Sequence, residues 1–286
     1  MTALESGATE LEAPFDISPL TPSIGAEISG IDLREPVDDA TLAALRRTLL
    51  DWKVLFFRDQ EISRARHIAF ARRFGSLEIH PLTPKEQPDP EVLRIVHNED
   101  FKGSENIWHS DVTWRPEPSL GSILRAVDVP ETGGDTLFAD MGAAYDGLPD
   151  DLKEKVCGLT AVHDFLHAFG PIIPAEQHEE TRKKHPPQEH PVIRTHPETG
   201  RRLIYVNAAF TDHVTGMARA ESDALLNFLY TQARVPEYQC RFRWQRNSIA
   251  FWDNRICQHY AVSDYWPQRR EMERVTICGD RPFFTP

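Results

Sequence analysis

The order of apolar and polar residues predicts a chain made mainly of short strands. Residues 53–58 and 120–129 are compact runs rich in β-branched, aromatic and other apolar side chains, which is typical of buried strands. Between residues 240 and 245 apolar and polar side chains alternate strictly, as they do in a strand with one buried face. Further strand signals lie at residues 202–206, 248–252 and 274–278.

Helical periodicity is strongest near the start of the chain. After Asp39, a candidate N-cap, three leucines fall on one helical stripe, and a second helix is expected over residues 63–75. One later helix is expected over residues 221–233. Many strands with a few helices indicate a mainly β fold with flanking helices, of the sandwich or jelly-roll kind.

Three regions differ in their expected organisation. Residues 1–13 are small and acidic, which predicts a disordered N-terminal tail. Residues 14–286 contain no repeat, low-complexity tract or linker, so we expect one domain. Within it, residues 169–191 are rich in Pro, His, Glu and Lys and have poor periodicity. Such a segment is typical of a lid, a binding loop or disorder, and we expect a lid insertion there.

Composition excludes several classes of function. The net charge of -12 argues against a nucleic-acid-binding face and against a polybasic membrane patch. No apolar run has the length of a membrane span, and the four cysteines form no C-x-x-C pair, which favours a reducing, cytoplasmic setting. The chain also has no P-loop, G-x-G-x-x-G or G-x-S-x-G motif.

His109 and Asp111 are the first candidates for chemistry. If this segment is extended, residues two apart point to the same face, so an imidazole and a carboxylate would lie side by side. With His259 as a second imidazole, the set would match the two-histidine, one-carboxylate arrangement of non-haem Fe(II). Taken alone, the pair also fits a surface hydrogen-bonding pair, and zinc accepts the same three ligands.

Arg270 and Arg274 are the second pair of candidates. On a strand they would share one face, and two neighbouring guanidinium groups repel each other unless anions neutralise them. Arginine is suited to binding a carboxylate or sulfonate with two hydrogen bonds. The alternative is a pair of surface arginines matched to some of the acidic residues. His163 and His167 are four residues apart but lack the glutamate of a zinc protease motif.

Together these residues resemble the taurine dioxygenase family of Fe(II)/2-oxoglutarate-dependent oxygenases. The matching motifs are WHSD at residues 108–111, GGDT at 133–136 and WDNR at 252–255, followed by His259 and the two arginines. The similarity extends from about residue 24 to residue 283. As a set, the motifs are highly specific for that family.

The resemblance implies a double-stranded β-helix, or jelly-roll, core in which His109, Asp111 and His259 bind iron. Arg270 would bind the distal carboxylate of 2-oxoglutarate, assisted by the hydroxyl group of Thr136, and O2 would be the other cosubstrate. Because halogenating relatives carry a small residue in place of Asp111, hydroxylation is expected.

The resemblance also implies a site for a small anionic organic substrate. The anion would be bound by His80, Arg274 and the backbone of Val112. An apolar wall would be formed by Phe169 and Phe210. The two positions that hold the amino end of taurine are replaced here by Thr83 and Glu105.

The expected reaction is hydroxylation of taurine or a related alkylsulfonate next to sulfur, which releases sulfite and an aldehyde, with succinate and CO2 as coproducts. The first alternative is the same chemistry on an alkyl sulfate ester or an aryloxyalkanoate. The second is a jelly roll that binds a metal or a small anion without catalysis. The resemblance further implies a homodimer or homotetramer.

Overall fold

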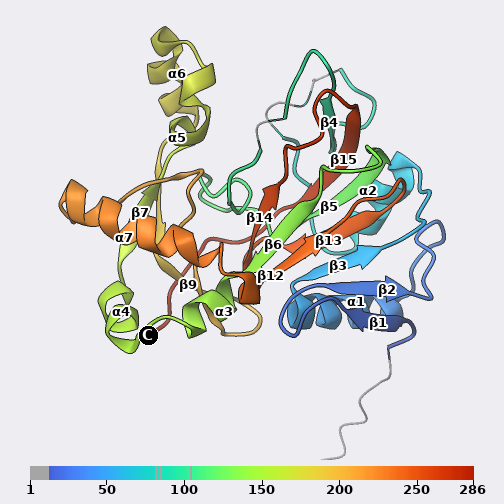
Figure 1. Ribbon diagram of the computed structural model, residues 1–286, viewed down its shortest axis with the longest axis horizontal. Coiled ribbons are helices and arrows are strands. Elements are labelled where there is room, and N and C mark those ends of the chain that lie inside the picture. Colours follow the sequence, from blue (N-terminus) through green and yellow to red (C-terminus); the bar gives the residue numbers. More distant parts are fainter. Residues whose placement is uncertain (1–12, 81–82, 84–85, 104) are drawn as a thin grey trace, which may run out of the picture.

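The computed structural model describes residues 13–80, 83, 86–103 and 105–286. The predicted tail therefore lies outside the described residues, apart from Ala13. Two sheets face each other at the centre of the molecule, and helices cover one outer side and one end (Figure 1). In the part of the chain that is described, no helix combines the length and apolar character needed to cross a membrane.

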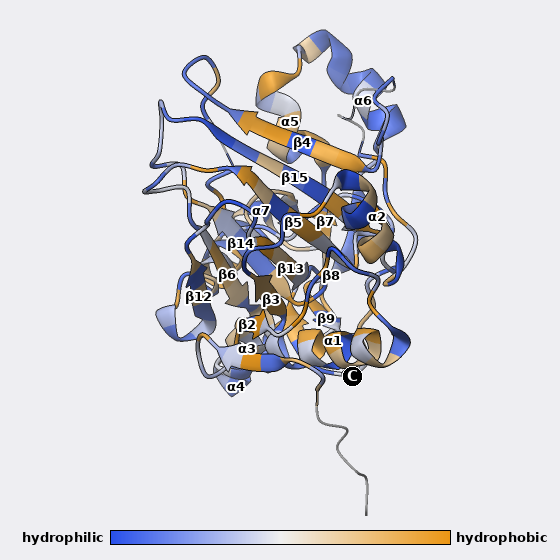
Figure 2. Ribbon diagram, turned by 90° about the vertical axis from the view of Figure 1, so that its right-hand side faces the viewer, coloured by the Kyte–Doolittle hydropathy of each residue, from blue (hydrophilic) through white to orange (hydrophobic). Residues whose placement is uncertain are grey.

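The larger sheet has seven strands, and its strand pairs are antiparallel except for β2 with β3. Figure 2 shows these strands in sequence from β4 at the top down to β2, with α1 and α2 beside them. In spatial order they are β1 (Asp16–Pro19), β2 (Ala26–Ser29), β3 (Val54–Phe57), β13 (Ile249–Asp253), β5 (Gly121–Asp128), β15 (Arg270–Ile277) and β4 (Val92–His97).

The smaller sheet consists of β12 (Gln239–Phe242), β6 (Thr136–Asp140) and β14 (Cys257–Ala261), with β6 in the middle. Strand alternation divides the buried side chains into two clusters. Phe56 and Trp252 of the larger sheet point inward and pack with Phe138 of the smaller one. Their neighbours Phe57 and Phe251 belong to the outer cluster, with α1 (Asp39–Trp52) and α2 (Arg64–Arg72). This is the expected jelly-roll core.

The remaining elements form a second region around the smaller sheet. It comprises α3 (Met141–Asp146), α4 (Asp150–Val156), α7 (Arg219–Gln232), η3 (Pro236–Tyr238), the two-stranded pair β9 (Ile193–Thr195) and β10 (Arg202–Ile204), and the sheet β11 (Thr211–Val214), β7 (Thr160–His163), β8 (Gln188–Pro191).

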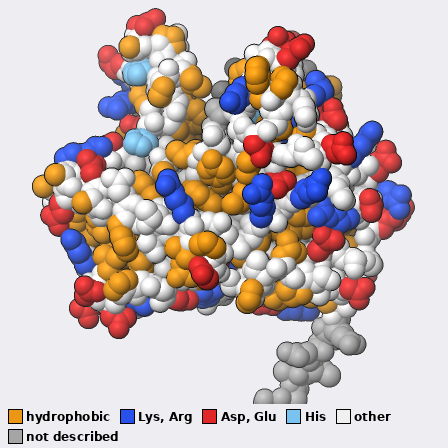
Figure 3. Space-filling view, in the orientation of Figure 1, with side chains coloured by type: hydrophobic (Ala, Val, Ile, Leu, Met, Phe, Trp, Pro, Cys, Tyr) orange, Lys and Arg blue, Asp and Glu red, His pale blue; other side chains and the backbone are white. Residues whose placement is uncertain are grey.

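A projecting arm carries the segment where the lid was expected. It contains α5 (Phe165–Phe169), η1 (Gly170–Ile172), η2 (Ala175–Gln177) and α6 (His178–Lys184), and β8 follows it. The segment is thus largely regular, contrary to what its poor periodicity indicated. In Figure 3 the arm stands apart from the projection formed by β4 and β15, and apolar side chains lie at the base between them. Its role as a lid stays a prediction.

Most of the predicted elements are confirmed with shifted ends. The helices over residues 39–52, 64–72 and 219–232 lie where periodicity placed them, and Ser63 caps the second through the Arg66 amide. The first cap was wrong by one residue: the Asp38 carboxylate accepts a hydrogen bond from the Thr41 amide, and Asp39 is already helical. The two positions carry the same side chain, so composition could not choose between them.

His67 of α2 gives the fold a dependence on pH. It is fully buried, its Nε2 donates to the Ile123 carbonyl at 3.0 Å, and burial lowers the pKa of His67 from 6.5 to about 4. Between these values the unfolded chain binds more protons than the folded one, so stability falls as the pH drops from 6.5 towards 4. In denaturant titrations, His67→Gln should reduce the stability lost between pH 7.5 and pH 5 by about 2 kcal/mol. An unchanged pH dependence would contradict this.

Candidate active site

The three predicted metal ligands converge at the β14 edge of the smaller sheet. His259 is the central residue of edge strand β14, and His109 pairs with it through two backbone hydrogen bonds of 3.1 and 2.8 Å. Nε2 of His109 lies 3.7 Å from Asp111 Oδ1, and Nε2 of His259 lies 4.0 Å from the same oxygen. No other group of three such side chains lies this close within the described ranges.

Asp111 reaches the site through a turn, so the extended segment assumed from the sequence was wrong beyond His109. The turn is held by Asn254, whose side chain accepts from the Asp111 amide at 2.7 Å and donates to its carbonyl at 3.0 Å. Ser110 anchors the other side by donating to the Cys257 carbonyl at 2.7 Å. The WHSD and WDNR motifs are therefore two halves of one scaffold.

Hydrogen bonding and burial prepare the ligands for a cation. Nδ1 of His109 lies 2.8 Å from the Ile107 carbonyl, so this nitrogen carries the proton and Nε2 is left as a lone-pair donor. Burial, followed by the nearby His109, lowers the pKa of His259 to about 3, so its imidazole is neutral. Burial opposes ionisation of Asp111, but the positive charge of Arg274 is the largest opposing effect, and the pKa of Asp111 is held well below its usual range.

Both arginines predicted for anion binding lie on β15 and line the cavity that also holds the triad histidines. Arg274 donates from Nη1 to Asp111 Oδ1 at 2.9 Å. The Nε atoms of Arg270 and Arg274 are buried and have no hydrogen-bond partner among the described residues. A buried charged donor without a partner is costly, so both groups favour an anionic ligand.

The GGDT motif shapes the wall around Arg270. Gly134 has a φ of +70°, and a Cβ atom there would lie 3.2 Å from Cδ of Arg270 and 3.1 Å from the ring of Tyr265. Thr136 lies in the same cavity and accepts a hydrogen bond from the Trp244 indole at 2.9 Å. A larger residue at 134 would be strained by the positive φ and would require the Arg270 or Tyr265 side chain to shift by a few tenths of an ångström.

Two residues of this wall were missed by sequence reasoning. The guanidinium of Arg270 lies 5.7 Å above the ring of Tyr265, and the Tyr265 hydroxyl is 2.6 Å from Nδ1 of His97. Nε2 of His97 in turn lies 3.4 Å from a carboxylate oxygen of Glu105. His97 faces Arg270 across paired strands β4 and β15, a pairing that no local pattern predicts. Burial lowers the pKa of Arg270.

The predicted substrate residues are distributed unevenly around the triad. The Phe210 ring lies 6.2 Å from that of His109, and Phe169 lies 6.1 Å from Phe210. Burial, followed by the charge of Arg274, lowers the pKa of His80 to about 4. Glu105 lines the triad cavity, whereas Thr83 is buried and its amide donates to the His80 carbonyl at 2.8 Å. Nothing in the described contacts joins Thr83 directly to the triad.

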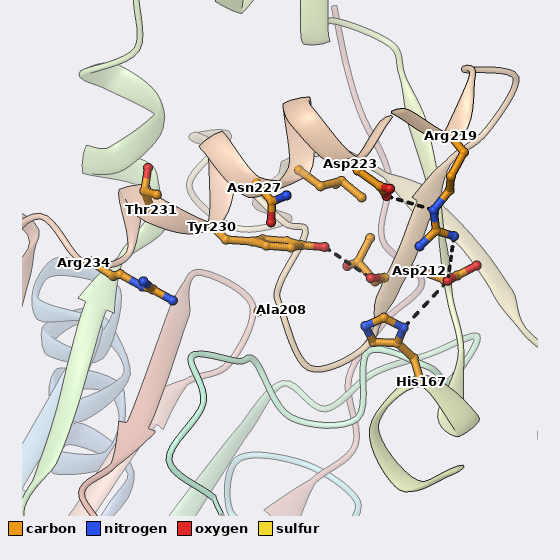
Figure 4. A pocket seen from close by; sticks show the side chains of 11 residues that line it. His167, Ala208, Asp212, Arg219, Asp223, Asn227, Tyr230, Thr231 and Arg234 are labelled. Carbon is orange, nitrogen blue, oxygen red and sulfur yellow. Dashed lines mark hydrogen bonds and ion pairs between the residues drawn. The ribbon is translucent and has the colours of Figure 1, made fainter. Parts of the chain in front are cut away.

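A separate cavity of about 480 Å³ lies between α7 and the arm (Figure 4). Three of its charged groups are matched with one another: Asp212 binds Arg219 at 3.1 Å and lies 3.7 Å from His167, and Asp223 binds Arg219 at 2.9 Å. None of the predicted metal or cosubstrate residues lines it. The smaller triad cavity therefore remains the candidate active site.

Comparisons with known proteins agree with this geometry. Residues 16–276 match the family described as "Taurine catabolism dioxygenase TauD, TfdA family". A relative from Pseudomonas putida, named alpha-ketoglutarate-dependent sulfate ester dioxygenase, is 36% identical over 94% of this chain and 91% of its own.

Two solved structures are also similar. The first is a putative alpha-ketoglutarate-dependent taurine dioxygenase from Burkholderia xenovorans, with a TM-score of 0.82, 37% identity and 94% of each chain covered. The second is AAD-2 in complex with Mn(II) and N-oxalylglycine, with a TM-score of 0.83 and 29% identity, covering 94% of this chain and 99% of that one.

The fold and the site define a 2-oxoglutarate-dependent dioxygenase. The chain belongs to the taurine catabolism dioxygenase TauD, TfdA family. Two imidazoles and one carboxylate form the donor set that suits Fe(II), and the buried Arg270 suits a carboxylate of 2-oxoglutarate. Iron(II), 2-oxoglutarate and O2 are thus its cofactor and cosubstrates, as expected.

Proposed function

We propose that this dioxygenase hydroxylates a small organosulfonate, taurine or a related alkylsulfonate, at the carbon bonded to sulfur. A C–H bond becomes C–OH at that carbon. The C–S bond then breaks, its electron pair leaves with sulfur as sulfite, the hydroxyl proton is lost, and an aldehyde remains. Bound iron and 2-oxoglutarate would supply the activation of O2. One oxygen atom of O2 would enter succinate as 2-oxoglutarate loses CO2, and the other would enter the substrate.

The observation that carries this proposal is the position of Arg274. Its guanidinium contacts the ligand Asp111 while its buried Nε lacks a partner among the described residues, so an anionic head group bound there lies beside the metal site. His80 shares the electrostatic environment of Arg274 and Asp111. A tetrahedral sulfonate offers three oxygens to such donors, and its α-carbon is then the first carbon near the metal.

The other side chains hold and shield the reactants. Arg270 would bind the distal carboxylate of 2-oxoglutarate with Thr136 beside it, and the ring of Tyr265 excludes water from the guanidinium. Phe210 and Phe169 supply apolar contact for the carbon chain next to His109. Glu105, 46% exposed in its side chain, lines the same cavity and would face the far end of the substrate.

A second candidate substrate is an alkyl sulfate ester. It is favoured by the 36% identical relative, whose name describes a sulfate ester dioxygenase. The same guanidinium would bind a sulfate head group, and hydroxylation of the carbon bonded to the ester oxygen would release sulfate and an aldehyde.

A substrate screen separates these reactions. Purified protein with Fe(II), ascorbate and 2-oxoglutarate is supplied with alkylsulfonates, alkyl sulfates and aryloxyalkanoates, and succinate is measured together with sulfite, sulfate and phenol. We expect sulfonate-dependent succinate with stoichiometric sulfite. Sulfate or phenol release without sulfite would replace the sulfonate proposal with the corresponding alternative. Succinate formation that no member of the panel stimulates would contradict all three.

Removing Arg274 should affect the substrate more than the cosubstrate. Arg274→Ala loses a charge-assisted contact of about 1.5–3 kcal/mol, so the substrate KM should rise about 10- to 150-fold. The KM for 2-oxoglutarate should change little. Arg94→Ala on neighbouring β4 is the control, because Arg94 binds Glu271 and does not line the cavity. Equal effects on both KM values would place Arg274 outside the substrate site.

A further inference from the structure

Val112 is the strained residue of the active site. Its φ of +51° lies in the left-handed region, which β-branched residues rarely adopt. Such a conformation persists only when surrounding contacts determine it. Val112 directly follows the ligand Asp111, and its own carbonyl accepts a hydrogen bond from the Arg115 amide at 3.0 Å.

Contacts on both sides determine this conformation. Before Val112, Asn254 holds both backbone groups of Asp111. After it, the hydroxyl group of Thr113 is fully buried between two side chains: Nδ2 of Asn207 donates to it at 3.0 Å, and Nδ1 of His163 lies 2.9 Å away. The Thr113 oxygen therefore accepts from Asn207, and its hydrogen bond with His163 can run in either direction, depending on which ring nitrogen of His163 carries the proton.

His163 is a buried, neutral member of this arrangement. His163 is completely buried at the end of β7, and burial, followed by the neighbouring His190, holds the pKa of His163 well below its ordinary value. Its role is therefore that of a fixed, uncharged hydrogen-bond partner of Thr113. Neither His163 nor Asn207 is among the residues that line the triad cavity.

The same contacts extend to the apolar wall of the site. Oδ1 of Asn207 accepts a hydrogen bond from the Phe210 amide at 3.1 Å. The Phe210 carbonyl in turn accepts from the amide of Asp164, the residue after His163, at 2.8 Å. The Phe210 backbone is thus bound at both its N–H and C=O groups to the elements that hold Thr113.

We propose that Thr113, His163 and Asn207 form a positioning network that holds the Val112 turn and Phe210 at a fixed separation and thereby orients the substrate beside the metal site. This rests on the proposed function, in which Phe210 contacts the substrate, and on the expectation that the Val112 backbone binds the anionic end. The network acts through those two residues and touches neither substrate nor metal. Loosening it lets 2-oxoglutarate be consumed without substrate oxidation, because the target C–H bond is no longer held in place.

The kinetic test compares Thr113→Val, which removes the hydroxyl group at nearly constant volume, with Thr113→Ser, which retains it. Thr113→Val should raise the substrate KM about 5- to 30-fold and raise the ratio of succinate to oxidised product. Thr113→Ser should restore both values. Thr48→Val, in another buried threonine far away on α1, is the control and should match the wild type.

A double-mutant cycle tests whether the network acts through Val112. Glycine adopts a positive φ without strain, so Val112→Gly removes the need for external support at that turn. The effect of Thr113→Val on KM should then be smaller in the Val112→Gly background than in the wild type. Equal effects in both backgrounds would overturn the link between the network and the turn.

Hydrogen exchange of the metal-free protein tests the network without any substrate. We expect the Arg115 and Phe210 amides to exchange at least about 5-fold faster in Thr113→Val than in Thr113→Ser or Thr48→Val. Unchanged exchange at both amides would overturn the proposal. If exchange rises but no organosulfur compound is oxidised by the wild type, the network stands and the proposed function fails.

Discussion

Replacing His259 by alanine should abolish turnover and remove most of the affinity for Fe(II). Nε2 of His259 lies 4.0 Å from Asp111 Oδ1, and burial keeps the imidazole neutral, so it is ready to donate to a metal. Loss of a residue that only forms a hydrogen bond to a metal ligand typically costs about 10- to 100-fold in metal affinity. Loss of one of three ligands should therefore exceed about 100-fold. Anaerobic titration with Fe(II) and a succinate assay measure the two effects.

The control for this variant is His213→Ala. His213 belongs to β11, pairs with Asp212 and lies outside the triad cavity, so iron affinity and turnover should match the wild type. A His259→Ala variant that keeps wild-type iron affinity and turnover would show that the ligand assignment is wrong.

Arg270→Ala should have the second largest effect, on the cosubstrate. The guanidinium is buried, its Nε has no partner among the described residues, and it lies over Tyr265 at 5.7 Å. Loss of a charge-assisted, two-bond contact costs about 1.5–3 kcal/mol, so the KM for 2-oxoglutarate should rise about 10- to 150-fold. Arg270→Lys should recover only part of this, because an ammonium group cannot form the same pair of bonds.

The adjacent Arg269 provides a matched control. Its side chain is 48% exposed and binds Asp128 and Glu271 instead of facing the cavity. Arg269→Ala should leave the KM for 2-oxoglutarate unchanged. If Arg270→Ala also left it unchanged, the cosubstrate would have to bind elsewhere.

The sequence predicted which side chains lie together at the candidate metal site, because they belong to short motifs. His109 and Asp111 are two residues apart, and His259 lies on a strand that pairs with the first motif through a single backbone bridge. The two-residue period of a strand was enough to predict that Arg270 and Arg274 share one face, and both residues lie on β15 as predicted. Local patterns therefore found each part, and the resemblance joined them.

The features that could not be predicted depend on contacts between distant segments of the chain. His97 and Tyr265 surround Arg270 because β4 pairs with β15, and these two strands are far apart in the sequence. The left-handed conformation of Val112 depends on Asn254 from one segment and on Thr113 contacts from others. A valine at this position gives no signal of its own, since it is among the residues least suited to a positive φ.

Helical order in the arm also lacked a local signal. α6 has no buried residue and is held partly by exposed pairs such as Lys183 with Glu179 and Lys184 with Glu180, so it shows no apolar stripe. Polar helices of this kind resemble loops in composition. The arm's closure over the substrate, and assembly into a homodimer or homotetramer, stay predictions.

The most direct test of the whole account is the visible absorption of the protein with Fe(II) and 2-oxoglutarate under anaerobic conditions. Chelation of iron by the 2-oxo acid group gives a charge-transfer band, which requires the metal triad and the cosubstrate site together. We predict one band per chain that is saturated by both components, is lost in His259→Ala and needs more 2-oxoglutarate in Arg270→Ala. Absence of the band in the wild type, or its full retention in His259→Ala, would contradict the account.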